Sequence, residues 1–138
     1  SVFFFFQYYL KEFKKNKNNL SIVNIGSIVG KNGFKELSGY ASSKSALLGL
    51  GKSLNSEYGS KGIRINTVNP GFIKTSYYKD FKKKKKLYNW TLSRTPSNRW
   101  GEPHEVANLV IFLLSDKASY INGEDINIDG GWLSSWKK

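Results

Sequence analysis

Three short apolar runs along the chain have the length and composition of β-strands. Leu20–Ile25 is rich in β-branched residues and suits a strand that is covered on both faces. The second run covers residues 63–68 and ends at Asn69-Pro70-Gly71, because proline cannot continue a central hydrogen-bond ladder. In the third, over residues 125–129, isoleucines alternate with polar residues before two glycines. We expect one strand at each of the three.

Apolar residues recur at helical spacing in three other segments. The first covers residues 2–14. The second runs from Tyr40 to about Tyr58 and is rich in Gly, Ala and Ser, which let a helix approach its neighbours closely. The third opens at Glu102-Pro103-His104-Glu105, with proline in the first turn and acids at the positive end of the helix dipole. The three apolar stripes consist of Val2, Phe6, Tyr9, Leu10 and Phe13; Ala46, Leu47, Leu50 and Leu54; and Val106, Leu109, Val110 and Leu113.

The predicted elements follow the order helix, strand, helix, strand, helix, strand. That alternation predicts an α/β fold with a Rossmann-like, doubly wound parallel sheet and helices on both faces. The glycines from Gly26 to Gly39 predict a loop after the first strand, and residues 72–100 are expected to be irregular because they show no clear single period. No internal repeat or linker divides the chain, so residues 1–138 are expected to form a single domain or part of one.

The composition excludes several classes of protein. With 39% hydrophobic and 15% aromatic residues, the chain has enough apolar side chains for a core. It has no cysteine, which excludes a disulfide scaffold and thiolate metal sites and fits a reducing compartment such as the cytoplasm. The single histidine, His104, excludes a multi-histidine metal site and is expected at the surface, so we predict no metal. No apolar stretch is long enough to cross a bilayer, so no membrane partner is expected.

A formal net charge of +12 is typical of proteins that bind nucleic acids. Here the charge is concentrated in two lysine-rich runs, residues 11–17 and 82–86, and only three residues are arginine. Lysine and asparagine runs beside many Phe, Tyr and Ile residues indicate the compositional bias of an AT-rich genome. We therefore interpret the lysines as solvated surface and expect no nucleic-acid partner.

A hydroxyl, a phenol and an ammonium are expected to meet at one edge of the predicted sheet. Ser27 follows the first strand, thirteen residues before Tyr40, and Lys44 lies four residues after Tyr40 on the same helix face. Ligands of open α/β sheets bind at the carboxyl ends of the strands, where Ser27 and residues 69–75 lie. An ordinary phenol has a pKa near 10, and a neighbouring ammonium favours its phenolate form. Such a phenol can exchange a proton with a substrate oxygen to which a hydroxyl donates.

The Tyr-x-x-x-Lys pair carries little information by itself, because the chain has 8 tyrosines and 19 lysines. A second pair, Tyr78 and Lys82, lies inside a lysine run. The alternative interpretation of the first pair is a core tyrosine with a surface lysine. The offset of Tyr40 from Ser27, and the expected position of both beside residues 69–75, favour Tyr40 over Tyr78.

Several segments together resemble the short-chain dehydrogenase/reductase family. They fall in the family's order and spacing over nearly the whole chain. The segments are Val23-Asn24-Ile25-Gly26-Ser27, Tyr40-Ala41-Ser42-Ser43-Lys44, Ile65-Asn66-Thr67-Val68-Asn69-Pro70-Gly71-Phe72-Ile73-Lys74-Thr75, Arg99-Trp100-Gly101-Glu102-Pro103-His104-Glu105-Val106-Ala107 and Asp129-Gly130-Gly131.

This resemblance implies a role for each candidate residue. Tyr40 would be the proton donor and acceptor, and Ser27 would bind the substrate oxygen together with it. Lys44 would bind the nicotinamide ribose and favour the phenolate of Tyr40, while a hydride passes between the nicotinamide of NAD or NADP and a substrate carbon. The residues implied on the cofactor side are Tyr40, Lys44, Pro70, Gly71, Ile73 and Thr75. In the family the first helix and the Tyr40 helix pack on a second subunit, so a homo-oligomer is also implied.

The chain departs from the family pattern at its start. The glycine-rich phosphate loop, Gly-x-x-x-Gly-x-Gly, does not occur in it, and the residue that selects NAD or NADP is missing with that loop. The asparagine that completes the family's catalytic set would fall just upstream of Ser1. We therefore expect residues 1–138 to be a single partial domain, the C-terminal half of a catalytic domain. Such a piece should expose the sheet edge and helix face that the other half covers, and should be catalytically inactive alone.

Two classes of function stay open at this stage. One is an NAD(P)-dependent alcohol dehydrogenase or ketoreductase that acts on a small molecule or an acyl-carrier substrate. Within it, Arg94-Thr95-Pro96, Arg99-Trp100-Gly101 and the Gly-Gly-Trp ending favour gluconate-type dehydrogenases, and 3-oxoacyl-acyl-carrier-protein reductases are almost as similar. The other is a non-catalytic binding or assembly protein whose lysines bind anions or nucleic acid.

Overall fold

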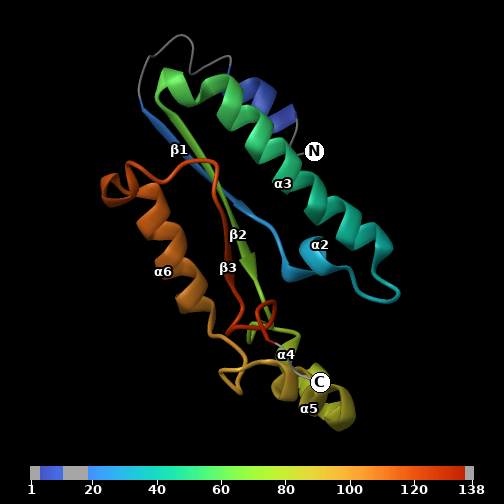
Figure 1. Cartoon of the computed structure of the whole chain (residues 1–138). Helices are drawn as coiled ribbons and strands as arrows, with labels where there is room; N and C mark the ends of the chain where they lie inside the picture. The colour runs from blue at the N-terminus through green and yellow to red at the C-terminus, as the bar shows by residue number, and fades with distance from the viewer. Residues whose placement is uncertain (1–3, 11–18, 136–138) are drawn as a thin grey trace.

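Three parallel strands form the centre of the protein, whose computed structural model describes residues 4–10 and 19–135 (Figure 1). β1 (Leu20–Ile25) pairs with β2 (Ile63–Pro70), and β2 pairs with β3 (Asp125–Ile128). The register aligns Leu20 with Ile63 and Thr67 with Asp125. The predicted α/β fold with parallel strands is confirmed.

Helices cover both faces of this sheet because β2 alternates apolar side chains between them. Ile63 and Ile65 point to one face, where they pack with Leu54 of α3 (Ser38–Tyr58) and with Phe6 of the helix at residues 4–10. Val68 points to the other face and packs with Leu113 of α6 (Pro103–Leu114). Figure 1 shows α3 and residues 4–10 on one side of the strands and α6 on the other.

Buried polar side chains fix the approach to β3. Asn66 donates to the Ile121 carbonyl and accepts from the Glu124 N–H, so both ends of its buried amide are bonded. Arg64 donates to the carbonyls of Leu113 and Ser115, where a cation offsets the negative end of the α6 dipole. These side chains of β2 therefore hold α6 and β3 in their places.

The three predicted helices are present, with differences at their ends and faces. α3 begins two residues before Tyr40 and ends at Tyr58; Leu54 of its predicted stripe is buried, whereas Ala46 is exposed. α6 has the predicted proline in its first turn, and its whole predicted stripe packs in the core. Residues 4–10 are helical with Phe6 and Leu10 buried, while the rest of the predicted helix 2–14 and the lysines of residues 11–17 lie outside the described residues.

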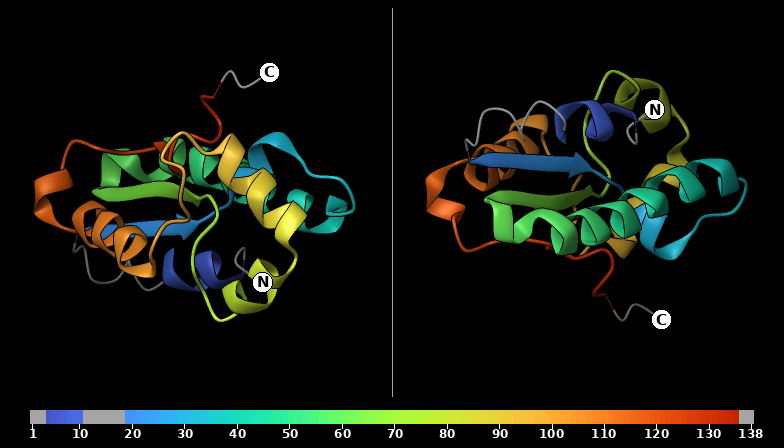
Figure 2. Two further views of the ribbon diagram at one scale, coloured as in Figure 1. Left: turned by 90° about the horizontal axis from the view of Figure 1, so that it is seen from below. Right: turned by 90° about the horizontal axis from the view of Figure 1, so that it is seen from above.

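Two predictions about irregular segments are wrong. The predicted loop after β1 contains a short helix, α2 (Ile28–Asn32), which begins where the Ser27 hydroxyl caps it. Residues 72–100, predicted to be irregular, contain α4 (Tyr78–Lys83) and α5 (Lys85–Arg94). Exposed lysines hide the helical period there, and three aromatic residues of these short helices, Tyr78, Phe81 and Tyr88, pack against the buried Trp100. The views in Figure 2 place α4 and α5 beyond the carboxyl ends of the strands.

One edge of the sheet has no further strand in the described part of the chain. β1 pairs there with β2 alone, and the side chain of Ile25 is 44% exposed. The predicted surface positions of Lys82–Lys86 and His104 are confirmed, because each is exposed. None of the described helices is long and apolar enough to cross a membrane.

Candidate functional site

A cavity of about 630 Å³ opens at the carboxyl ends of β1 and β2. Its wall contains the residues that the sequence singled out, which come from the start of α2, the first turns of α3 and the turn after β2. These residues are Ser27, Tyr40, Lys44, Pro70, Gly71, Ile73 and Thr75. The fold therefore brings together at one cavity side chains that lie up to 48 positions apart in the sequence.

Ser27 is buried at the junction of β1 and α2. Its Oγ accepts a hydrogen bond of 3.2 Å from the Val29 N–H and so caps the helix. That bond uses a lone pair of Oγ and not its hydrogen, so the hydroxyl can still donate into the cavity. The cap fixes the position of a group that remains able to bind a substrate oxygen.

Tyr40 and Lys44 lie one turn apart on α3, as the sequence predicts. The Lys44 Nζ donates a 2.8 Å hydrogen bond to the Ile25 carbonyl, the last of β1. The same nitrogen lies 5.7 Å from the centroid of the Tyr40 ring. Tyr40 lines the cavity and is 47% exposed, so a ligand can reach it.

A glycine makes the close approach of α2 and α3 possible. A Cβ on Gly30 would lie 2.9 Å from the backbone carbonyl carbon of Lys44 and from the Ser45 N. At that distance a side chain cannot be accommodated unless one helix moves. Gly30 therefore sets the separation between the helix that Ser27 caps and the helix that carries Tyr40.

The turn from Pro70 to Thr75 is held from two sides. The Gly71 N–H donates to the Ile128 carbonyl, and a Cβ at Gly71 would meet the Asp129 Cα at 2.8 Å. Ile73 forms an isolated bridge with Gly101, supported by a 2.9 Å bond from the Lys74 N–H to the Gly101 carbonyl. The turn thus presents a fixed wall to the cavity.

The sequence reasoning missed part of the cavity wall. Val29, Leu37, Tyr77 and Val106 line it, and so does the buried Trp100. Trp100 belongs to a segment that resembles the family pattern, and this resemblance could have identified it as a residue near the site. Tyr77 and Leu37 lie in stretches without a clear period, so no sequence signal marked them.

The second Tyr-x-x-x-Lys pair has nearly the same local geometry but lies away from this cavity. The Lys82 Nζ is 5.8 Å from the Tyr78 ring centroid, and Tyr78 is not among the lining residues. A 3.1 Å hydrogen bond joins the hydroxyls of Tyr78 and Tyr88. This bond lowers the pKa of Tyr78, with a further contribution from Lys82 and Lys74, and the same bond raises the pKa of Tyr88.

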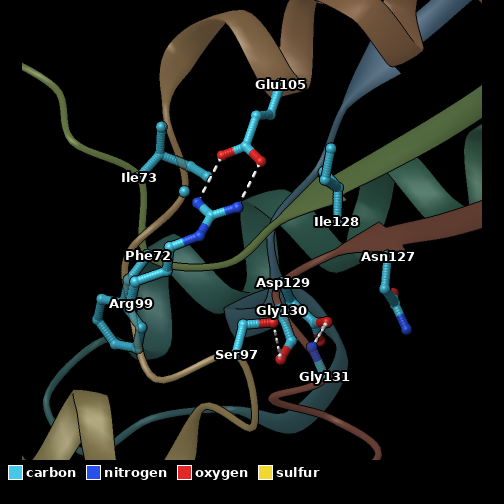
Figure 3. A pocket seen from close by; sticks show the side chains of 11 residues that line it. Phe72, Ile73, Ser97, Arg99, Glu105, Asn127, Ile128, Asp129, Gly130 and Gly131 are labelled. Carbon is cyan, nitrogen blue, oxygen red and sulfur yellow. Dashed lines mark hydrogen bonds and ion pairs between the residues drawn. The ribbon is translucent and has the colours of Figure 1, made fainter.

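A second cavity, of about 330 Å³, shares Phe72 and Ile73 with the first (Figure 3). The Arg99 guanidinium binds both carboxylate oxygens of Glu105, at 2.8 and 2.7 Å. These bonds, together with one from the Glu102 N–H, lower the pKa of Glu105 to about 2. The Asp129 carboxylate accepts the N–H groups of Gly131 and Leu133. Because these charges are bonded to protein groups, we assign this cavity a structural role.

The residues at the first cavity fit the nicotinamide riboside end of a dinucleotide. Lys44 and Tyr40 offer an ammonium and a phenol to ribose hydroxyls, and Pro70, Gly71 and Ile73 offer a fixed apolar wall to a flat ring. Within residues 4–10 and 19–135, no group of three or more His, Asp or Glu side chains has the arrangement of a metal site.

Comparison with known proteins relates the chain to oxidoreductases. The sequence profile of the family described as enoyl-(acyl carrier protein) reductase matches residues 1–133. The 3-oxoacyl-(acyl-carrier-protein) reductase of Buchnera aphidicola subsp. Schizaphis graminum is 47% identical over 110 residues, which are 80% of this chain and 44% of that protein. The cyclohexanol dehydrogenase of Acinetobacter sp. is 43% identical over 116 residues, or 83% of this chain and 43% of the relative.

Solved structures give the same relationship. An Agrobacterium tumefaciens protein described as a 2-deoxy-d-gluconate 3-dehydrogenase, with bound NADP, superposes with a TM-score of 0.94 at 33% identity, covering 97% of this chain and 55% of that one. A 4-hydroxyisoleucine dehydrogenase complexed with NADH has a TM-score of 0.93 at 33% identity, with the same coverage. The chain thus spans about half the length of the proteins it matches.

Proposed function

The chain belongs to the short-chain dehydrogenase/reductase family, and we propose that it carries the acid–base half of an NAD(P)-dependent oxidoreductase. The proposed reaction interconverts a carbonyl and a secondary alcohol. The observation that carries this proposal is the cavity at which Ser27, Tyr40 and Lys44 meet the turn that follows β2. A hydroxyl, a phenol and an ammonium at the carboxyl edge of a parallel sheet suit proton exchange with one bound oxygen.

Tyr40 and Ser27 would act on the same substrate oxygen. In the reductive direction Tyr40 gives its phenolic proton to the carbonyl oxygen as that oxygen gains negative charge, and in the oxidative direction it takes the proton back. Ser27 donates a hydrogen bond to the oxygen and stabilises the developing charge. The cap that holds its Oγ supports this role, because a donor fixed in advance needs no reorganisation during the reaction.

Lys44 would hold the cofactor ribose and favour the phenolate of Tyr40. Its position supports both tasks, because its Nζ is anchored to the Ile25 carbonyl and lies over the Tyr40 ring. An ammonium has three hydrogens, so one bond to a carbonyl leaves two for a ligand. When bound, NAD or NADP supplies or accepts the hydride at the substrate carbon.

We further propose that residues 1–138 are a partial domain and that turnover requires a segment with a glycine-rich phosphate loop. The absence of Gly-x-x-x-Gly-x-Gly from the sequence supports this, as does the coverage of about half of each relative. The edge position of β1 offers a place where further strands can pair. The exposed Phe5 and Tyr8 of the first helix support a contact with a second subunit in a cytoplasmic homo-oligomer.

Two substrate classes remain candidates for the complete enzyme. The relatives include enzymes described as acting on 3-oxoacyl-(acyl carrier protein) and others described as gluconate dehydrogenases. Both chemistries use a secondary alcohol and its ketone, so the same three residues serve either one. The difference lies in the groups that flank the reacting carbon.

A chimera tests the proposed reaction. This chain replaces the matching 44% of the Buchnera aphidicola reductase, whose remaining sequence supplies the missing half. We expect the chimera to oxidise NADH or NADPH in the presence of a 3-oxoacyl thioester and the unfused 138-residue chain to show no turnover. A folded chimera that binds either cofactor but reduces no ketone would contradict the proposed reaction. Turnover by the unfused chain would contradict the requirement for a second segment.

A further inference from the structure

We propose that the site selects ketones and secondary alcohols with apolar flanks and discriminates against sugar acids. This inference rests on the proposed function, because that function assigns Ser27, Tyr40, Lys44, Pro70, Gly71, Ile73 and Thr75 to catalysis and the cofactor. The rest of the cavity wall is then left for the substrate. It consists mainly of Val29, Leu37, Phe72, Tyr77, Trp100 and Val106.

This remaining wall has few polar groups to offer. The indole N–H of Trp100 is already used, because it donates a 2.7 Å hydrogen bond to the Thr91 Oγ1 behind the wall. Trp100 is almost fully buried, so this bond is shielded from solvent. The Tyr77 hydroxyl is the polar side-chain group that stays available among the six wall residues. Partial desolvation raises the pKa of Tyr77, which favours the neutral form that a phenol already has at neutral pH.

The wall also lacks a spare cation for a carboxylate. Among the described lining residues Lys44 alone is basic, and it is bonded to the Ile25 carbonyl and assigned to the cofactor. Arg99 directly precedes the wall residue Trp100 in the sequence, but it lines the second cavity. Both terminal nitrogens of its guanidinium are bonded to the Glu105 carboxylate. Lys74, beside the turn, is paired with Glu102.

These facts decide between the two substrate classes. A sugar acid brings a carboxylate and several hydroxyls, and each polar group that loses water without gaining a partner lowers affinity by roughly tenfold. A ketone with aliphatic flanks gains from the same surface, because apolar area is removed from water on both sides. Leu37 and Tyr77, both partly exposed at the mouth of the cavity, are the residues that such a ligand would cover.

Direct binding to the chimera saturated with oxidised cofactor tests this inference, because the cofactor then occupies Lys44 and the turn after β2 and the ketone cannot be reduced. Methyl NMR signals of Val29 and Val106 are followed during titration with cyclohexanone and, separately, with sodium gluconate. We expect cyclohexanone to shift both signals in a saturable way and gluconate to bind at least roughly tenfold more weakly. Equal or tighter binding of gluconate would overturn the inference, as would the absence of any shift with cyclohexanone.

A matched pair of variants locates the effect. Leu37 and Leu87 are each 41% exposed, but Leu37 lines the cavity and Leu87 lies on α5 away from it. Leu37→Arg should weaken cyclohexanone binding by about fivefold and strengthen gluconate binding, while Leu87→Arg should change either by less than about twofold. Unchanged binding by a folded Leu37→Arg protein would overturn the inference. Failure of the proposed reaction would instead appear as a chimera without turnover of NADH or NADPH, whatever the binding result.

Discussion

At the residue scale, the two Tyr-x-x-x-Lys pairs show that a lysine beside a phenol does not define a site. The ammonium lies 5.7 Å from the ring in the Tyr40 pair and 5.8 Å in the Tyr78 pair. The pKa of Tyr78 is lowered, and the largest cause is its hydrogen bond to Tyr88. What distinguishes Tyr40 is the cavity that it shares with Ser27. Access to a bound ligand therefore separates the two pairs, and the i,i+4 spacing does not.

Removing the Ser27 hydroxyl should affect both catalysis and stability, because one oxygen performs two tasks. In the chimera, Ser27→Ala should lower kcat by roughly 10²–10³-fold, as expected for the loss of one donor to a developing oxyanion. The free energy of unfolding should fall by about 1 kcal/mol, since the Val29 N–H loses its cap. Steady-state kinetics and urea unfolding measure the two effects. Ser27→Thr keeps the hydroxyl and serves as the control; an alanine variant with full activity would contradict the assignment.

At the element scale, short helices and close glycine contacts determine how the site is assembled. α2 is only five residues long, yet it carries the cap at Ser27 and packs on α3 through Gly30. α6 begins with a reciprocal capping box between Glu102 and Glu105, and Arg99 ties the same carboxylate to the preceding loop. These contacts hold the first turn of α6, whose Val106 lines the cavity.

Two glycine-to-alanine changes should have opposite effects on stability. Gly30→Ala should lower the free energy of unfolding by about 1–3 kcal/mol, because its Cβ would meet the α3 backbone at 2.9 Å. At Gly49, in the middle of α3, an added Cβ would meet nothing within 4 Å. Gly49→Ala should therefore raise the free energy of unfolding by about 0.5–1 kcal/mol through helix propensity. Urea unfolding compares the two variants with the parent chain. Equal effects would contradict the close packing of α2 on α3.

The Arg99–Glu105 pair should make the stability of the protein depend on pH in the acidic range. The folded pKa of Glu105, about 2, lies below its ordinary value of 4.5. The stabilisation is therefore present above pH 4.5 and is lost as the pH falls toward 2. Glu105→Gln should lower the Tm by roughly a few °C at pH 7. Near pH 2 the Tm values of the variant and the parent should be the same. A constant difference between the two proteins over this range would contradict the assignment.

The sequence predicted the elements that pack on the sheet better than the short helices outside it, for a physical reason. The bounds of β1 were predicted without error, and so was the stripe of α6, because burial on a fixed face imposes a strict period. α4 and α5 were missed because their lysines face solvent, and because Phe81 and Tyr88 pack against Trp100, a contact between segments that no local period reveals. The cavity contains all the predicted site residues, but Leu37 and Tyr77 join it through tertiary packing alone.

At the scale of the whole molecule, the described sheet has β1 at an edge, and the lysine run lies on other elements. Lys82–Lys86 are exposed on α4 and α5, beyond the carboxyl ends of the strands. Ile25 is 44% exposed at the end of β1. An edge strand with an exposed apolar side chain tends to pair with another strand. We therefore expect β1 to govern association of this chain.

A lysine on this edge should suppress self-association. Ile25→Lys should weaken the association constant of the 138-residue chain by about tenfold or more, because pairing would then bring like charges together. Leu87→Lys adds the same charge on α5 and should have little effect. Sedimentation velocity over a range of concentrations compares them. Equal suppression by both variants would indicate an effect of net charge and contradict a role for the β1 edge.

The central claim is that Tyr40 is the group that exchanges a proton with the substrate. Its most direct test replaces the tyrosine of each Tyr-x-x-x-Lys pair by phenylalanine in the chimera. The measured quantity is kcat/KM for a 3-oxoacyl thioester. Tyr40→Phe should lower kcat/KM by about 10²–10⁴-fold, because the phenolic proton is lost from the site. Tyr78→Phe should stay within about twofold of the parent, because Tyr78 does not line the cavity. Comparable losses in the two variants, or an active Tyr40→Phe enzyme, would contradict the account.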